Sequence, residues 1–313
     1  MWQKTIEKYV TCAGIGLHSG RKVALGFHPA PAGSGVKFAV QGPAGTHFVV
    51  PDPKLVAETR FATSLVQGDV RLGTIEHVLA AVRGLEIDNL IIEVQGDEVP
   101  IMDGSAASFV LLLRQAGIRE QKTRRRIYRV VKECKVQQDG RWVKAFPSSG
   151  FKVKYTIDFP HPLLGKQSLD YEGSAENFVH LLCRARTFGF LHDVERLQGQ
   201  GLILGGSLEN ALVLDECAAL NPDGLRFPDE PVRHKLLDFI GDLGLMPYPV
   251  QGAFEVHCSG HELNNKFVCR LEQEKDTCLQ LIEQGQDPAH AQQGDLTSQS
   301  CPPSTRAEQA LGY

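Results

Sequence analysis

The chain has 313 residues, of which 42% are hydrophobic and 22% are charged, and its 33 Lys and Arg against 37 Asp and Glu give a formal net charge of −4. This composition is typical of a globular protein and excludes a collagen, a coiled coil and a chain that is disordered throughout. Without a basic excess, the whole-chain charge gives no basis for binding nucleic acid or an anionic membrane surface. At roughly 150 residues per domain, the length suggests two domains.

The eight cysteines are irregularly spaced and form no Cys-x-x-Cys pair. Their spacing therefore predicts neither a disulfide framework nor a structural zinc knuckle, and it favours a reducing cytoplasm. Glu7 lies where a signal peptide needs an apolar core, and apolar runs such as residues 109–113 are far shorter than the roughly 20 residues that span a bilayer. We expect a cytoplasmic protein without a signal peptide or a transmembrane segment.

The first third of the chain carries strand patterns separated by Gly and Pro. Residues 23–27 and 36–40 are strand-like, with a loop over residues 28–33 between them, and residues 88–94 form a third strand pattern. Strands therefore outnumber helices in this part of the chain.

Two helices are predicted among these strands. Thr74 is a suitable N-cap for the first, and Gly84 follows its last turn at the position that favours a left-handed C-cap. Ser105 or Ser108 could cap the second helix, over residues 109–116. The order strand, helix, strand, helix predicts a two-layer α+β sandwich.

The domain organisation follows from changes in composition. We expect a first α+β domain over residues 1–121, a basic linker over 122–126 and a second α+β domain over 127–283, with no residue-level internal repeat. The basic run is either a solvated linker, which we favour, or a phosphate-binding patch. Residues 284–313 have almost no large apolar side chains, which predicts a disordered tail.

One helical segment of the second half carries its acidic and histidine residues on a single face. Projected at about 100° per residue, His234, Asp238 and Asp242 lie together at successive spacings of four. The opposite face is apolar and consists of Val232, Leu236, Phe239, Ile240 and Leu243. Side chains four residues apart have Cβ atoms about 5–6 Å apart, so an imidazole and a carboxylate could bind one ion. The alternative is a surface salt bridge.

The first predicted helix offers a complementary pair. Glu76 and His77 point away from its apolar face, and His77 alone would be a solvated surface residue. If His77 instead meets His234 and Asp238 across a domain interface, two imidazoles and one carboxylate make the ligand set of a catalytic zinc with an open position for water. Zinc lowers the pKa of that water and polarises a carbonyl, and Glu76 would be the general base.

A third polar cluster begins at a glycine turn that enters a helix, where His261 follows Gly260. The helix dipole disfavours the charged imidazole, whereas a carboxylate such as Asp242 would favour it. These opposed effects could make His261 an acid or base near neutral pH. The alternative is a histidine of a capping turn with no catalytic role.

Six motifs occur in order along the chain: GLHSG at 16–20, TIEH at 74–77, PIMDGSA at 100–106, RTFG at 186–189, HKLLDFIGD at 234–242 and GHELNN at 260–265. Together they resemble the zinc-dependent UDP-3-O-acyl-N-acetylglucosamine deacetylases, which catalyse the committed step of lipid A synthesis in Gram-negative bacteria. The resemblance extends from about residue 3 to residue 272.

The resemblance implies a metal site and a base. Zn²⁺ would be bound by His77, His234 and Asp238. Glu76 would activate the metal-bound water for attack on the acetamide carbonyl of the substrate.

The resemblance also implies roles around the metal. His261 would donate a proton to the leaving amine or stabilise the oxyanion, and Asp242 would orient it. Thr187 would add an oxyanion hydrogen bond, and Lys235 would contact the polar head of the substrate.

The segment 188–206 begins with Phe188, an implied substrate contact, and corresponds to the insert of the family that forms an acyl-chain passage. From its residues alone it is an amphipathic segment packed on the core. The family fold is two similar α+β sandwiches with the active site between them.

The implied partner is a UDP-linked acylated glucosamine, bound by a monomer that transiently contacts the inner membrane surface, with no nucleic acid involved. Two alternatives remain open. One is a zinc amidohydrolase for a different substrate, and the other is a nucleotide-sugar or lipid sensor that has lost catalysis.

Overall fold

The computed structural model describes residues 1–42 and 45–284. A first sheet has the strand order β2-β3-β9-β4-β5, in which β4 and β9 are parallel and the other neighbours antiparallel. Its strands are β2 (Val10–Ile15), β3 (Lys22–Pro29), β4 (Val36–Gly42), β5 (Gly45–Val49) and β9 (Leu90–Gln95). The three strands expected in this region are confirmed, with β3 extending two residues into the expected loop.

The second sheet repeats this arrangement in the order β12-β13-β18-β14-β15, again with one parallel pair, β14 and β18. Its strands are β12 (Cys134–Gln138), β13 (Arg141–Phe146), β14 (Phe151–Phe159), β15 (Gly165–Glu172) and β18 (Val250–His257). β11 (Arg126–Val130) pairs in parallel with the first residues of β18. On its other side, β11 pairs antiparallel with β19 (Leu279–Glu283). The two halves therefore share a topology that no residue-level repeat indicated.

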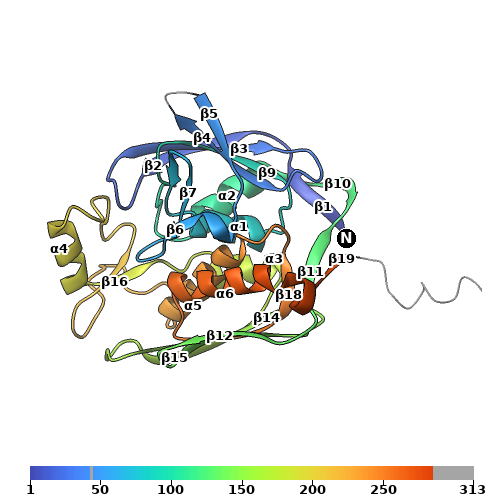
Figure 1. Cartoon of the computed structure of the whole chain (residues 1–313). Helices are drawn as coiled ribbons and strands as arrows, with labels where there is room; N and C mark the ends of the chain where they lie inside the picture. The colour runs from blue at the N-terminus through green and yellow to red at the C-terminus, as the bar shows by residue number, and fades with distance from the viewer. Residues whose placement is uncertain (43–44, 285–313) are drawn as a thin grey trace, which may run out of the picture.

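Four helices fill the space between the sheets. Figure 1 shows α1 (Glu76–Gly84) and α2 (Ala107–Gln115) against the first sheet, and α5 (Glu230–Leu243) and α6 (His261–Gln273) against the second. The remaining elements are β1 (Trp2–Ile6), η1 (Pro53–Leu55), β6 (Val56–Glu58), β7 (Ser64–Gln67), β8 (Val70–Leu72), β10 (Ile118–Arg124), α3 (Ala175–Asn177), η2 (Phe178–Leu182), β16 (Phe188–Phe190), α4 (Leu191–Gly199), β17 (Leu212–Leu214) and α7 (Lys275–Cys278). The α+β class is confirmed.

Helices α1 and α5 are in direct contact, which requires a glycine. A Cβ at Gly241 would lie 2.1 Å from the backbone oxygen of Glu76. Because α1 is covered by the first sheet on one side and by α5 on the other, every residue from Glu76 to Val82 is buried. The alternative in which His77 is a solvated surface residue is therefore excluded.

The two ends of α1 differ from the expected caps. Thr74 has a φ of +59° and donates its hydroxyl to Glu98 Oε1 (3.0 Å), so it does not cap the helix. Gly84 is the last helical residue and has no positive φ; its missing Cβ instead makes room for Phe178, whose ring carbons lie 2.3 Å from the Cβ position. At α2, the Ser105 hydroxyl accepts from the backbone N–H of Ala107 (3.1 Å), so Ser105 and not Ser108 supports the helix start.

The basic run 122–126 is exposed except at Arg125, as expected of a solvated segment, but it lies in two strands. Lys122 to Arg124 belong to β10, and Arg126 begins β11. Arg125 is buried and its guanidinium is paired with Asp88 (2.9 Å) and Glu86 (3.6 Å), so it is not a free phosphate site.

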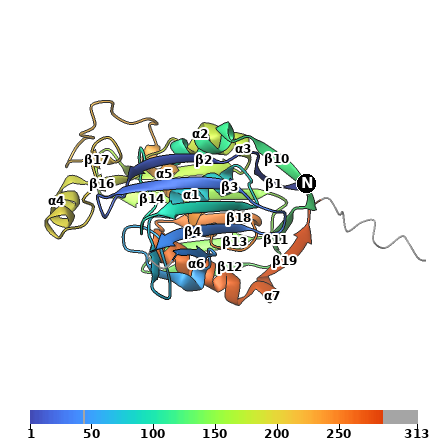
Figure 2. The same ribbon diagram turned by 90° about the horizontal axis from the view of Figure 1, so that it is seen from above.

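The segment 188–206 projects from the body of the molecule, with α4 beyond the edge of both sheets (Figures 1 and 2). Only Leu197 of α4 is buried, so the segment is not packed on the main core. The predicted tail, 284–313, lies outside the described residues except for Gln284. Within residues 1–42 and 45–284, no helix has the length and apolar character needed to cross a membrane.

The close contact between α1 and α5 predicts that Gly241→Ala lowers the free energy of unfolding. The added methyl group must push α5 away from α1, and overpacking of this kind costs about 1–3 kcal/mol of unfolding free energy. Urea unfolding measures it, with Gly199→Ala as the control because nothing lies within 4 Å of that Cβ position. Equal unfolding free energies for Gly241→Ala and the unmodified chain would contradict the contact.

Candidate metal centre

The contact between α1 and α5 brings together His77, His234 and Asp238, whose candidate ligand atoms all lie within 4.8 Å of one another. The Nε2 atoms of His234 and His77 are 3.2 Å and 3.6 Å from Asp238 Oδ1. Ligands around a tetrahedral ion with bonds of about 2.0–2.1 Å are about 3.3 Å apart. The spacing of the three side chains therefore fits one metal ion.

An unpartnered oxygen supports this fit. Asp238 Oδ1 is buried and makes no hydrogen bond with acceptable geometry among the described residues, although both imidazoles approach it. A buried carboxylate oxygen without a partner carries a desolvation cost of about 1–3 kcal/mol or more. A cation between the imidazoles and this oxygen would remove that cost.

The surroundings set the protonation states that a metal needs. His234 Nδ1 lies 3.0 Å from the carbonyl oxygen of Ala185, which accepts its proton and leaves Nε2 free to bind an ion. Burial lowers the pKa of His234. Burial alone would raise the pKa of Asp238, but His234 and Lys235 outweigh it and hold that pKa well below its ordinary value. A neutral imidazole and an ionised carboxylate result.

Glu76 and His261 face the same space from two different helices. His261 Nε2 is 4.0 Å from Glu76 Oε1 and 3.8 Å from Asp238 Oδ2, while its Nδ1 is 2.9 Å from Asp242 Oδ2. Burial lowers the pKa of His261, but the carboxylates of Asp242, Asp238 and Glu76 outweigh it and raise the pKa to about 9. Burial raises the pKa of Glu76. The site therefore pairs a cationic imidazole with a carboxyl group of increased basicity.

Two residues that orient this pair escaped the sequence reasoning. Thr63 donates its backbone N–H to Glu76 Oε2 (3.0 Å) and its hydroxyl to Asp242 Oδ1 (2.6 Å). Asn264 donates its amide to Asp242 Oδ2 (2.8 Å). Asn264 follows His261 by one helical turn and could have been found from that spacing, whereas no local pattern marks Thr63.

The segment that carries Thr187 and Phe188 follows Ala185 directly, beside His234. Lys235 Nζ lies 5.6 Å from the centre of the Phe188 ring and donates to Asp238 Oδ2 (2.8 Å). Thr187 is half-buried and is fixed through its backbone, which donates to the Gly104 carbonyl (2.7 Å). Lys235 thus contacts a candidate metal ligand and Phe188 lies beside Lys235. Their contacts with substrate and the role of the Thr187 hydroxyl stay predictions.

A buried ion pair anchors this segment on α5. Arg186 donates both its backbone N–H and its Nε to Glu230 Oε1, each at 2.9 Å, and Glu230 is fully buried at the first turn of α5. The pair holds the Ala185 carbonyl in position against His234.

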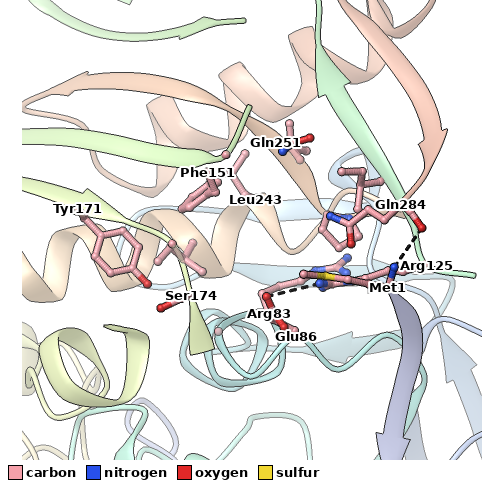
Figure 3. A pocket seen from close by; sticks show the side chains of 17 residues that line it. Met1, Arg83, Glu86, Arg125, Phe151, Tyr171, Ser174, Leu243, Gln251 and Gln284 are labelled. Carbon is pink, nitrogen blue, oxygen red and sulfur yellow. Dashed lines mark hydrogen bonds and ion pairs between the residues drawn. The ribbon is translucent and has the colours of Figure 1, made fainter. Parts of the chain in front are cut away.

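The candidate metal centre is distinct from a cavity of about 240 Å³ at the other end of the two central helices. This cavity is lined by Arg83 and Gly84 of α1 and by Ile240 and Leu243 of α5, together with Phe151 and Tyr171 from the second sheet (Figure 3). None of the predicted site residues lines it.

Comparison with known proteins gives one consistent result. The LpxC family model, described as UDP-3-O-acyl N-acetylglycosamine deacetylase, matches residues 3–273. The chain belongs to this family. A protein of Oleidesulfovibrio alaskensis named UDP-3-O-acyl-N-acetylglucosamine deacetylase is 50% identical over 283 residues, covering 90% of this chain and 93% of the relative. A protein of Nitratidesulfovibrio vulgaris with the same name is 50% identical over 283 residues (90% and 92%), and one of Haemophilus influenzae is 48% identical over 269 residues (85% and 88%).

Membership of the UDP-3-O-acyl-N-acetylglucosamine deacetylase family confirms the resemblance drawn from the six motifs. The matched residues include all nine of the predicted site residues. The family is a metalloenzyme family, in agreement with the ligand set that α1 and α5 assemble.

Because Arg186 is paired with the buried Glu230, we expect Arg186→Met to lower the free energy of unfolding strongly. This change leaves a buried carboxylate without its cation, which costs about 3–5 kcal/mol of unfolding free energy. Denaturant unfolding measures it, and Arg184→Met is the matched control because Arg184 is exposed. Adding Glu230→Gln to Arg186→Met should restore much of the lost unfolding free energy. If Arg186→Met alone is as stable as Arg184→Met, the pair does not anchor α5.

Proposed function

We propose that this chain hydrolyses the N-acetyl group of a UDP-linked 3-O-acyl-N-acetylglucosamine to a free amine and acetate, the committed step of lipid A biosynthesis. The observation that carries the proposal is the buried His77, His234 and Asp238 cluster facing Glu76 and His261. Relatives that cover nearly the whole chain and bear the name of this deacetylase support the substrate class.

In this proposal the metal is zinc, held by His77, His234 and Asp238. Two imidazoles and one carboxylate are a common ligand set of catalytic zinc. When bound, zinc supplies a Lewis acid for the amide carbonyl and lowers the pKa of a water molecule. The contribution of the protein is the buried cluster in which Lys235 balances the charge of Asp238.

Glu76 acts as the general base. Its Oε2 is held by the Thr63 N–H, which leaves Oε1 directed toward His261 and free to take the proton of the attacking water. Because burial raises the pKa of Glu76, its carboxylate is a stronger base than an exposed one.

His261 acts as the acid. Its raised pKa keeps the imidazole protonated at neutral pH, and Asp242 holds Nδ1, so Nε2 carries the proton toward the leaving amine. The same cation stabilises negative charge that develops on the carbonyl oxygen, to which Thr187 adds a hydroxyl donor.

Substrate contacts are assigned to the segment beside the metal centre. Lys235 and Phe188 offer a cation and an aromatic face to the sugar nucleotide. The projecting segment 188–206 carries Leu202, Ile203 and Leu204, which would line the acyl-chain passage. We further propose that the chain works as a monomer in the cytoplasm and visits the inner membrane surface to meet its acylated substrate.

Acetate release from the UDP-linked substrate, with metal content measured on the same sample, tests this function. The chain should hold zinc and release acetate, and a chelator should abolish the activity until zinc is restored. Glu76→Gln should lower kcat by about 10²–10⁴-fold with zinc retained, because it removes the base and no ligand.

The outcomes separate the competing functions. Zinc binding without acetate release, with the substrate bound unchanged, would indicate a sensor. Equal rates with and without the 3-O-acyl chain would indicate an amidohydrolase for a different substrate. Loss of zinc from Glu76→Gln would make Glu76 a ligand and contradict its role as base.

A further inference from the structure

A second cluster of metal-binding side chains lies at the end of α6 that is remote from His261. It consists of Cys134 at the start of β12, Glu274 between α6 and α7, and Cys278 at the end of α7, and its candidate ligand atoms all lie within 4.8 Å of one another. The 13 residues of α6, about 20 Å of helix, separate it from the candidate metal centre. Cys134 and Cys278 are far apart in the sequence, so no spacing motif reveals the cluster.

The distances within this cluster fit a thiolate-rich ion site. Cys278 Sγ is 3.6 Å and Cys134 Sγ is 4.0 Å from Glu274 Oε2. Around a tetrahedral zinc ion with Zn–S bonds of about 2.3 Å and Zn–O bonds of about 2.0 Å, neighbouring S and O ligands are about 3.5 Å apart. The two observed S–O distances exceed this value by about 0.1 Å and 0.5 Å. The carbonyl oxygen of Glu133 lies 3.8 Å from Cys278 Sγ, at the edge of the cluster, and could serve as a fourth ligand of the ion.

Arg270 orients the carboxylate of this cluster and balances its charge. The guanidinium of Arg270 is paired with Glu274 Oε1 at 2.5 Å, so Oε2 is the oxygen that faces the two sulfur atoms. A charged group that orients a metal-binding side chain in this way is a common feature of metal sites. Two thiolates and one carboxylate around a divalent cation carry a net charge of −1, which Arg270 neutralises.

The two sulfur atoms are protected and unreactive without an ion. Both side chains are 2% exposed, and burial raises the pKa of Cys134 to about 12 and also raises that of Cys278. Binding of an ion by two thiolates releases the proton of each thiol. The reaction forms two metal–sulfur bonds and involves no oxidation.

We propose that Cys134, Glu274 and Cys278 form a structural site for one thiophilic divalent cation such as Zn²⁺, separate from the catalytic centre. The ion joins β12 to the corner between α6 and α7, just before β19 returns the chain to the second sheet. It thereby stabilises the end of the second half of the molecule.

Cobalt binding tests this site independently of catalysis. Thiolate–Co²⁺ coordination gives a near-ultraviolet charge-transfer band, which the His77, His234 and Asp238 centre cannot give because it contains no sulfur. The reduced full-length chain should take up two Co²⁺ ions and show the band. The Cys134→Ser/Cys278→Ser variant should take up one ion and lose the band. Cys269 is a partly buried cysteine outside the cluster. The control variant Cys269→Ser should therefore still take up two Co²⁺ ions and show the band.

Three results would overturn the proposal. These are a reduced chain that shows no thiolate band, a Cys134–Cys278 disulfide that forms in place of ion binding, and a band that survives in the double variant. If that variant does not fold, Glu274→Gln keeps both thiols. Glu274→Gln should weaken Co²⁺ binding to the cluster by about tenfold or more. An unchanged midpoint of the thiolate band in a Co²⁺ titration would contradict the assignment of Glu274 as a ligand.

Discussion

The contact of α1 with α5 is the constraint on which the rest of the structure depends. At Gly241 the backbone of α5 approaches the Glu76 carbonyl more closely than any side chain would allow. Each helix carries only part of the ligand set, with His77 on α1 and His234 and Asp238 on α5. The candidate metal centre therefore exists only when the two halves are docked, and the same contact that buries α1 completes the site.

Burying so many polar groups in one place is costly unless each has a partner. Thr63 links Glu76 to Asp242, Lys235 compensates the charge of Asp238, and the Arg186–Glu230 pair supports the backbone that receives the proton of His234. The oxygen left over is Asp238 Oδ1, the atom that faces both imidazoles. Among the described residues, the other atom of this cluster without a partner is His77 Nδ1, so the unpartnered atoms belong to two of the three candidate ligands.

Helical periodicity explains what could be predicted from the sequence. The spacing of four placed His234, Asp238 and Asp242 on one face, and the first predicted helix and the glycine turn supplied His77 and His261 as candidates before the motifs of the family gave them roles. Periodicity cannot show that a second helix covers the polar face of α1, so from the residues alone a solvated His77 and a buried ligand both stayed open. Thr63 and Arg125 were missed because their partners are distant in the sequence. The shared strand order of the two sheets depends on backbone pairing, which unrelated residues can satisfy equally well.

Anomalous diffraction from crystals of the zinc-loaded chain, recorded at the zinc absorption edge, tests the central claim most directly. The account predicts a peak between α1 and α5, bound by Nε2 of His77, Nε2 of His234 and the carboxylate of Asp238. Zinc in the crystals with no peak at that position would contradict it, as would a peak at which Glu76 or His261 replaces one of the three ligands.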